Sequence, residues 1–238
     1  MDSLKKRLKN IPLIGVFATY VYRNVVRPKA IPFPGTEEYW EERYAGGGNS
    51  GCGSGGKLAE FKAEVINLFV DEHGIQTVIE FGCGDGNHIS LANYPTYLGL
   101  DVSATAISLC REKFASDKSK AFKLMREYEG EEAELALSLD VIYHLVEDDL
   151  FEKYMHSLFS AAEVYVLIYS SDTDDNKGFE GSYVKHRKFT GWVSENVRGW
   201  DLTLHIPNRY PYQGNWREES FADFFIYEKT RVDGDSDI

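Results

Sequence analysis

Short apolar runs alternate with segments of helical periodicity through the middle of this chain. Five runs have the length and composition of buried strands, at residues 77–81, 97–102, 122–125, 135–139 and 164–169. Apolar residues recur three and four positions apart at 58–69 and 150–159, which predicts helices, and Ser103 is placed to cap another. Strands that alternate with helices predict a parallel sheet with helices on both faces.

The C-terminal part has a different pattern. Two further apolar runs, at 202–206 and 221–227, have no helical segment between them. They predict an antiparallel hairpin at the edge of the sheet. We therefore expect an α/β fold, namely a three-layer sandwich. Its seven-stranded sheet is mostly parallel and has an antiparallel terminal hairpin strand.

The first 35 residues predict a basic, apolar helix followed by a proline-rich linker. Residues 1–29 carry seven Lys and Arg but a single acid. The apolar run at 11–26 is interrupted by Pro12 and Arg23, so it is too short for a membrane-spanning helix of about 20 residues. Two interpretations stay open. The helix docks on the body or on a second copy of the chain as a homodimer, or it lies on a membrane surface facing anionic lipid.

We divide the rest of the chain into three parts. Residues 36–56 are a second segment, residues 57–229 are the predicted main domain, and residues 230–238 are an acidic tail. Aromatic residues cluster at 39–44, and seven of the eleven residues at 46–56 are glycine. We call 46–56 the Gly-rich loop. It is either a plain linker or, as we expect, a loop that closes over a ligand.

Composition and charge exclude several classes of protein. The chain has 238 residues, of which 43% are hydrophobic, so it is not a disordered protein. Its net charge of −12 disfavours non-specific binding to nucleic acid. The three cysteines, Cys52, Cys83 and Cys110, argue against a disulfide framework and a structural zinc site. We therefore expect a cytoplasmic protein, with the inner membrane face as an additional location if residues 1–29 bind lipid.

The loop after the first strand indicates the ligand. Its glycines have the spacing G-x-G-x-G, whereas a dinucleotide-binding loop would need a glycine where Asn87 stands. Glu80 precedes the glycines, and its charge would repel a pyrophosphate but suit an ammonium and a sulfonium. Asp101 ends the second strand, where one carboxylate can accept hydrogen bonds from two ribose hydroxyls.

Three segments in this order resemble class I S-adenosylmethionine-dependent methyltransferases. They are residues 78–86, 97–103 and 138–145. The resemblance covers about residues 57–229 and implies S-adenosylmethionine as cofactor. It implies cofactor contacts for Glu80, Gly82, Cys83, Gly84, Asp101, Val102, Asp140, Tyr143 and Tyr44. Residues 127–130 would lie near the adenine edge.

Methyl transfer to a hydroxyl needs a base to remove its proton, and the candidate catalytic residues are His144 and His186. Arg187, Lys188 and Arg209 are candidates for binding an anionic acceptor. We expect no metal site. Asp172, Asp174 and Asp175 could hold a cation, but their spacing is also typical of a solvated turn.

The absence of one sequence motif narrows the class of methyl acceptor. No Asn-Pro-Pro-Tyr type motif follows the fourth strand, so the sequence does not resemble the methyltransferases that act on nucleic-acid bases. We expect methyl transfer to a hydroxyl or amine of a small molecule or glycan precursor. A protein methyltransferase and a catalytically silent cofactor-binding or partner protein are the alternatives. A nicotinamide-dependent reductase is disfavoured by Glu80 and Asn87.

Overall fold

This computed structural model describes residues 33–179 and 182–230. The chain divides into two units, Met1–Phe33 and Pro34–Ile238, and the fold below is that of the second. The predictions for residues 1–29, and for the tail beyond residue 230, fall outside the described residues.

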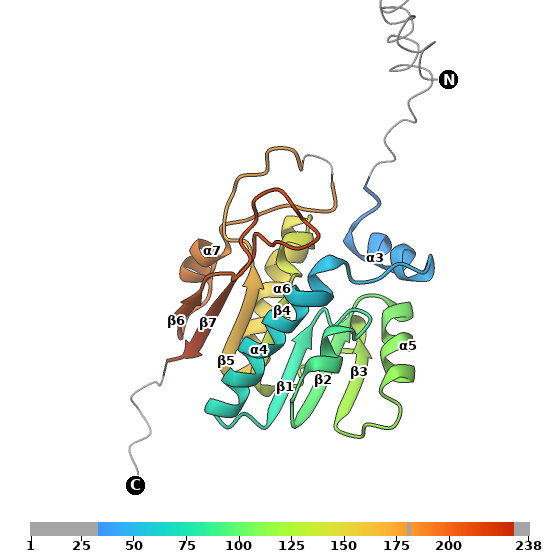
Figure 1. The fold of residues 1–238 in the computed structure, drawn as a ribbon. Coiled ribbons are helices and arrows are strands. Elements are labelled where there is room, and N and C mark those ends of the chain that lie inside the picture. The colour runs from blue at the N-terminus through green and yellow to red at the C-terminus, as the bar shows by residue number, and fades with distance from the viewer. Residues whose placement is uncertain (1–32, 180–181, 231–238) are drawn as a thin grey trace, which may run out of the picture. The chain divides into compact units, whose positions relative to one another are not determined.

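One seven-stranded sheet organises the second unit (Figure 1). Its strands are β1 (Thr77–Phe81), β2 (Thr96–Asp101), β3 (Lys120–Leu124), β4 (Ala133–Leu139), β5 (Ala162–Ser170), β6 (Trp200–Ile206) and β7 (Asp223–Lys229). They lie in the order β3-β2-β1-β4-β5-β7-β6. The first five are parallel, and β7 lies antiparallel between β5 and β6. The predicted mostly parallel sheet with an antiparallel terminal hairpin is confirmed.

Helices cover both faces of this sheet because its central strands are apolar on both sides. The helices are α4 (Gly56–Glu72), α5 (Ala104–Lys113), α6 (Asp148–Ser160) and α7 (Phe189–Asn196). In β7, Phe224 and Ile226 pack in the same core as α4 and α5, while Phe225 and Tyr227 pack in the core that holds α6 and α7. Successive strand residues point to opposite faces, so one strand serves both cores. The three-layer arrangement follows.

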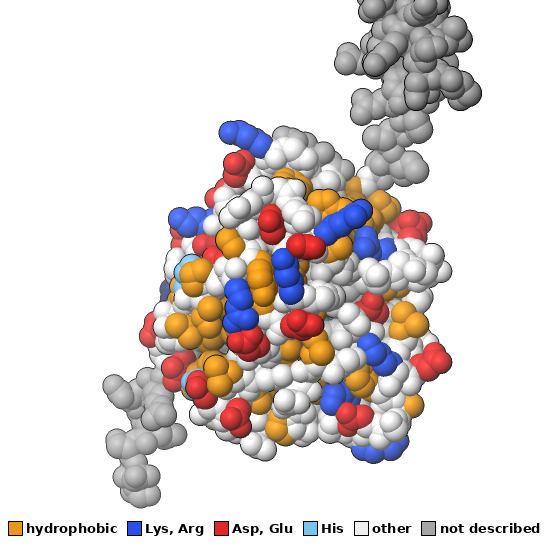
Figure 2. Space-filling model, in the orientation of Figure 1, with side chains coloured by type: hydrophobic (Ala, Val, Ile, Leu, Met, Phe, Trp, Pro, Cys, Tyr) orange, Lys and Arg blue, Asp and Glu red, His pale blue; other side chains and the backbone are white. Residues whose placement is uncertain are grey.

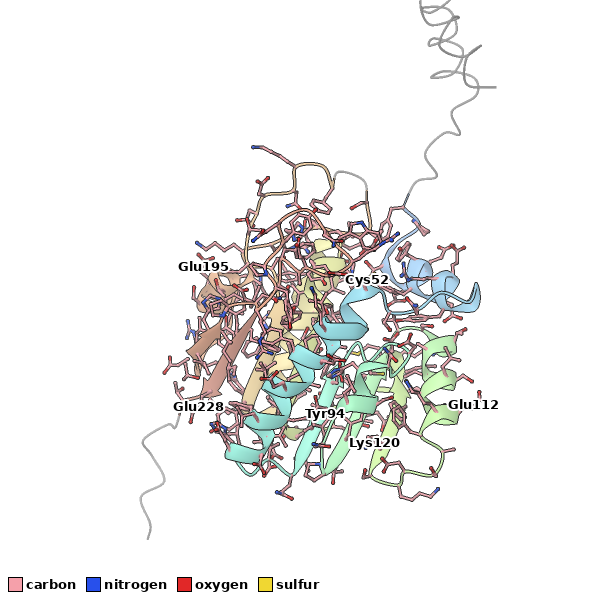
Figure 3. All side chains as sticks on the ribbon, viewed as in Figure 1. Cys52, Tyr94, Glu112, Lys120, Glu195 and Glu228 are labelled. Carbon is pink, nitrogen blue, oxygen red and sulfur yellow. The ribbon has the colours of Figure 1, made fainter. Side chains whose placement is uncertain are left out.

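The segment before α4 forms its own structure. The predicted aromatic segment belongs to α3 (Thr36–Ala45), and the Gly-rich loop contains a short 3-10 helix, η2 (Cys52–Ser54). Figure 3 places the labelled Cys52 between α3 and the near end of α4. Residues 36–56 thus pack on the main domain instead of trailing from it.

The surface of the second unit carries hydrophobic and charged side chains side by side. Figure 2 shows hydrophobic side chains interspersed with both signs of charge on the face that carries α4. Among the described residues, no helix combines the length and apolarity needed to cross a membrane.

Candidate functional site

The turn after β1 requires glycine for steric reasons. Gly82 and Gly84 have φ angles of 88° and 58°, a region that other residues rarely occupy. A Cβ on Gly82 would lie 2.4 Å from Cγ2 of Val141. The backbone therefore passes close to the loop that follows β4, and the carboxyl ends of β1, β2 and β4 meet around one space.

That space is a cavity of about 390 Å³. Eight of the nine predicted cofactor-binding residues line it: Tyr44, Glu80, Gly82, Cys83, Gly84, Asp101, Val102 and Asp140. The ninth, Tyr143, donates a hydrogen bond of 2.6 Å to Oδ1 of Asp140. Within the segment expected near an adenine edge, Tyr128 lines the cavity, together with Met125 and Arg126 before it. Ligands of open α/β sheets bind at this edge.

Two buried carboxyl groups, Glu80 and Asp101, face the cavity. Glu80 is 2% exposed and accepts a 2.7 Å hydrogen bond from the Tyr97 hydroxyl. Desolvation raises the pKa of Glu80 to about 7. Asp101 accepts hydrogen bonds from the amides of Gly84 and Ser103, both at 2.9 Å. Burial still raises the pKa of Asp101 to about 6. Both groups line the cavity and can accept hydrogen bonds from a polar ligand.

The Gly-rich loop closes on the glycine turn. The hydroxyl of Ser50 lies 3.0 Å from the Tyr44 hydroxyl and donates to Oδ1 of Asp85 at 2.9 Å. A Cβ on Gly84 would lie 2.3 Å from Oγ of Ser50. Asn87 also donates to the carbonyl of Ser54. The loop is therefore the outer wall of the cavity, and a side chain larger than hydrogen at position 84 would displace it.

Helix α3 is fastened at both ends. Its Glu41 accepts hydrogen bonds from the hydroxyls of Thr105 at 2.6 Å and Ser103 at 2.7 Å. These bonds hold the pKa of the Glu41 carboxyl below its ordinary value. At the start of α3, the Thr36 hydroxyl donates to Glu147 at 2.6 Å. The helix thus bridges the segment after β2 and the segment after β4.

Lys62 was not predicted as a site residue, yet it lines the cavity. It comes from α4, is 1% exposed, and its Nζ lies 2.5 Å from Oδ2 of Asp140. The sequence held a signal, because position 62 is four residues after Leu58 and so falls on the apolar face of the helix. A lysine on that face is unusual and needs a partner in the interior.

Asp140 has an unusual backbone. Its φ of 61° makes it the one residue other than glycine with positive φ among those described. Asp tolerates this region better than most residues, but at some cost in strain. The amide of Asp140 donates to the carbonyl of Tyr169, and Oδ1 and Oδ2 contact Tyr143 and Lys62. These contacts hold the side chain toward the cavity.

His144 also lines the cavity, with a defined protonation state. Its Nδ1 lies 3.0 Å from the Tyr183 carbonyl, which can only accept, so Nδ1 carries the proton. Desolvation, increased by the rings of Trp40 and Tyr183 packed on it, lowers the pKa of His144 to about 4. At neutral pH the ring is uncharged, and Nε2 keeps a lone pair that can accept a proton.

No protein-family model matches the sequence, and no curated protein matches it either. Solved structures do match. The N-methyltransferase NodS from Bradyrhizobium japonicum WM9, crystallised with S-adenosyl-L-homocysteine, is 13% identical with a TM-score of 0.64. The match covers 82% of this chain and 99% of NodS. This chain has the fold of the class I S-adenosylmethionine-dependent methyltransferases.

Other proteins with this methyltransferase fold differ in their acceptors. Magnesium protoporphyrin IX methyltransferase from Synechocystis PCC 6803, with bound S-adenosylmethionine, is 13% identical with a TM-score of 0.59. That match covers 85% of this chain and all of the other, 100%. The small RNA methyltransferase HEN1 is 16% identical with a TM-score of 0.53, and the match covers 73% of this chain and 25% of HEN1. These similarities establish the fold and leave the acceptor open.

Besides Tyr143, four predicted site residues lie outside the cavity of this methyltransferase fold. His186 is buried, with Nδ1 2.7 Å from the Ser171 hydroxyl. Arg187 donates to the carbonyls of Leu145 and Val146 and pairs with Asp148. Thus Arg187 holds the loop that carries His144 and has no contact with the cavity.

The other two cationic residues, Lys188 and Arg209, also lie outside the cavity lining. Lys188 is exposed, and its amide donates to Asp174 at 2.9 Å. Arg209 forms two hydrogen bonds, of 2.7 and 2.8 Å, with Glu64 on α4. The expected grip on an anionic acceptor is not assembled by these side chains.

His88 is a further cavity residue that sequence reasoning missed. It is 5% exposed, and its Nδ1 has no hydrogen-bond partner among the described residues. Its Nε2 lies 3.4 Å from the Tyr94 hydroxyl. Burial, with the Lys62 charge, lowers the pKa of His88 to about 3, so the ring is neutral. This buried nitrogen in the cavity wall therefore has hydrogen-bonding capacity that a ligand could use.

The acidic residues after β5 accept hydrogen bonds from nearby backbone and side-chain groups. Asp172 accepts from the amide and hydroxyl of Thr190, at 3.0 and 2.7 Å, and so caps α7. Asp175 accepts from the amide of Lys177. In the described part of the chain, no group of three metal-ligating side chains could hold a metal ion.

Proposed function

We propose that this chain is an S-adenosylmethionine-dependent methyltransferase that acts on a hydroxyl or amine of a small molecule or glycan precursor. One observation carries the proposal. The cavity at the carboxyl edge of the sheet holds two buried carboxyl groups, Glu80 and Asp101, on either side of the glycine turn.

The cavity residues fit this cofactor. Asp101 can accept hydrogen bonds from both ribose hydroxyls, in place of water. Val102, Met125 and Tyr128 offer an apolar surface to the adenine. Glu80, when ionised, suits the ammonium of the amino-acid end. The bound cofactor supplies an activated methyl group, and everything else must come from the chain.

The chain's contribution to the chemistry is alignment and proton removal. The walls formed by α3 and the Gly-rich loop exclude water and hold acceptor and cofactor together. For a hydroxyl acceptor, Nε2 of His144 would take the hydroxyl proton while the oxygen gains the methyl carbon. The bond from that carbon to the sulfonium sulfur would break, and S-adenosylhomocysteine would be the leaving group. An amine that arrives unprotonated has a lone pair already and needs the alignment alone.

The charge of the chain supports an acceptor that is not a nucleic acid. The net charge is −12, and Arg187 and Arg209 are engaged in ion pairs within the protein. The basic, apolar segment 1–29 supports an acceptor that is presented at a membrane surface, such as a lipid-linked glycan precursor. A homodimer through the same segment is the other use we propose for it.

Calorimetric titration with S-adenosylmethionine, S-adenosylhomocysteine and NADH tests the cofactor assignment. We expect micromolar binding of the first two, no binding of NADH, and at least a tenfold loss of affinity in Asp101→Ala, because two ribose hydrogen bonds are lost. The exposed Asp71→Asn serves as the control. Binding of NADH alone, or of none of the three, would overturn the proposed function.

A further inference from the structure

Four ionisable side chains lie close together at one end of the cavity wall, because Lys62 pairs with Asp140 and its charge acts on both Glu80 and His88. Lys62, Glu80 and His88 are 1%, 2% and 5% exposed, and the side chain of Asp140 is 16% exposed. All four line the same space. A buried charge without a partner is costly, so the pairing of these groups decides which ligand charges the cavity accepts.

Lys62 has spare bonding capacity. An ammonium carries three donors, and in the described residues its one hydrogen bond goes to Asp140. Its other close contact is the ring of Tyr169, 5.2 Å from Nζ. Lys62 therefore has N–H groups that could donate hydrogen bonds to a second carboxylate in the cavity.

Asp140 is held independently of Lys62. Its backbone is fixed at φ 61°, its Oδ1 accepts from Tyr143, and the backbone of Gly53 packs so close that a Cβ there would lie 2.9 Å from Oδ2. Because these contacts do not involve Lys62, Asp140 would keep its place if the lysine turned to another partner.

His88 gives a second, independent sign of a ligand at this end. Its unpartnered Nδ1 lies in the same cavity wall and is within the electrostatic reach of Lys62. Neutral imidazole can donate one hydrogen bond to a carboxylate or accept one from an ammonium, according to its tautomer. A zwitterionic amino-acid group would satisfy both side chains.

We propose that Lys62 changes its ion-pair partner from one carboxylate to another when the cofactor binds. Without cofactor it pairs with Asp140, and with cofactor it pairs with the carboxylate of the amino-acid end, next to His88. This inference rests on the proposed function. The exchange would free Oδ2 of Asp140, close to His144 along the chain, to accept a hydrogen bond from the acceptor. Cofactor binding would thus prepare the acceptor site, and the cofactor would bind first.

Asp140→Asn is the decisive variant. Asn tolerates positive φ as well as Asp does, and its amide oxygen can still accept from Tyr143, but it no longer competes for Lys62 as a charge. We expect Asp140→Asn to bind S-adenosylmethionine about fivefold to tenfold more tightly than the unmodified chain, as measured by calorimetry. Decarboxylated S-adenosylmethionine, which lacks the carboxylate, should gain nothing.

Lys62→Met gives the opposite expectation. It should bind S-adenosylmethionine at least tenfold more weakly and decarboxylated S-adenosylmethionine with an affinity changed less than about twofold. The matched control is Lys57→Met, on the same helix but outside the cavity, where both affinities should stay unchanged. If a single variant unfolds, Lys62→Met combined with Asp140→Asn removes both members of the ion pair together and should bind both ligands alike.

The outcomes separate the two proposals. Failure of the unmodified chain to bind S-adenosylmethionine or S-adenosylhomocysteine would reject the methyltransferase function itself. Normal binding of these ligands, with weaker binding in Asp140→Asn or an equal loss for both ligands in Lys62→Met, would reject the exchange and leave the function standing.

Discussion

Glu80 shows how one buried residue couples protonation to ligand binding. Its surroundings disfavour the carboxylate, and the Tyr97 hydroxyl and Lys62 offset only part of that penalty, so its pKa rises to about 7. Asp101 raises the pKa further because it is a nearby like charge. A ligand that brings an ammonium to Glu80 favours the ionised form.

The affinity for S-adenosylmethionine should therefore depend on pH. The free protein holds a proton on Glu80 below pH 7, and that proton must leave when the ammonium binds. We expect affinity to fall as pH is lowered below about 7, by as much as tenfold per pH unit, and to level off above it. Calorimetry from pH 5.5 to 8.5 measures this, with Glu80→Gln as the comparison. An unchanged slope in Glu80→Gln would show that another group titrates.

At the scale of the element, α3 and the Gly-rich loop form one wall of the cavity. This wall is attached to the rest of the domain by hydrogen bonds. Glu41 joins α3 to the start of α5, Thr36 joins it to Glu147, and Ser50 joins the loop to Asp85. These bonds are only partly buried and are made by side chains, so this wall is the part of the site best suited to open for a ligand.

Loss of the Glu41 anchor should loosen the wall with little effect on the domain. We expect Glu41→Ala to increase the rate of proteolytic cleavage within residues 46–56 about tenfold, since two strong hydrogen bonds to Ser103 and Thr105 are lost. The melting temperature should fall by less than about 3 °C. Glu42→Ala, at the exposed neighbouring position, is the matched control. Equal cleavage in the two variants would mean that α3 is held in another way.

At the scale of the whole molecule, the two hydrophobic cores that the described residues form lie within Pro34–Ile238. Their members run from Phe61 to Tyr227 and include strands and helices on both faces of the sheet. Because these described cores extend over both faces of the sheet, we expect the unit to fold without the first 33 residues.

Removal of residues 1–33 should leave the folding of the domain unchanged but abolish its binding to membranes. We expect the shortened chain to melt within about 2 °C of the full chain and to bind S-adenosylmethionine equally well. Sedimentation with anionic liposomes should retain the full chain and lose the shortened one. Equal liposome binding by both, or by neither, would contradict the proposed membrane contact. A lower melting temperature would place part of the core in the removed segment.

The sequence by itself determined the succession of strands along the chain, the glycine turn and the position of Asp101. These features depend on neighbouring residues, through hydrophobic periodicity and backbone conformation, so they can be predicted locally. Helix α7 was not predicted because it is only 8 residues long and contains Gly191, which disfavours a helix.

The tertiary structure decided which charges are free for a ligand. Lys62 meets Asp140 across 78 positions, and Arg209 meets Glu64 across 145. The Tyr183 carbonyl selects the tautomer of His144 from 39 residues away. Partners of this kind depend on how distant segments pack and on which atoms burial leaves unpaired. No local pattern encodes them, so His144 and His186 were equal candidates until the fold placed only His144 at the cavity.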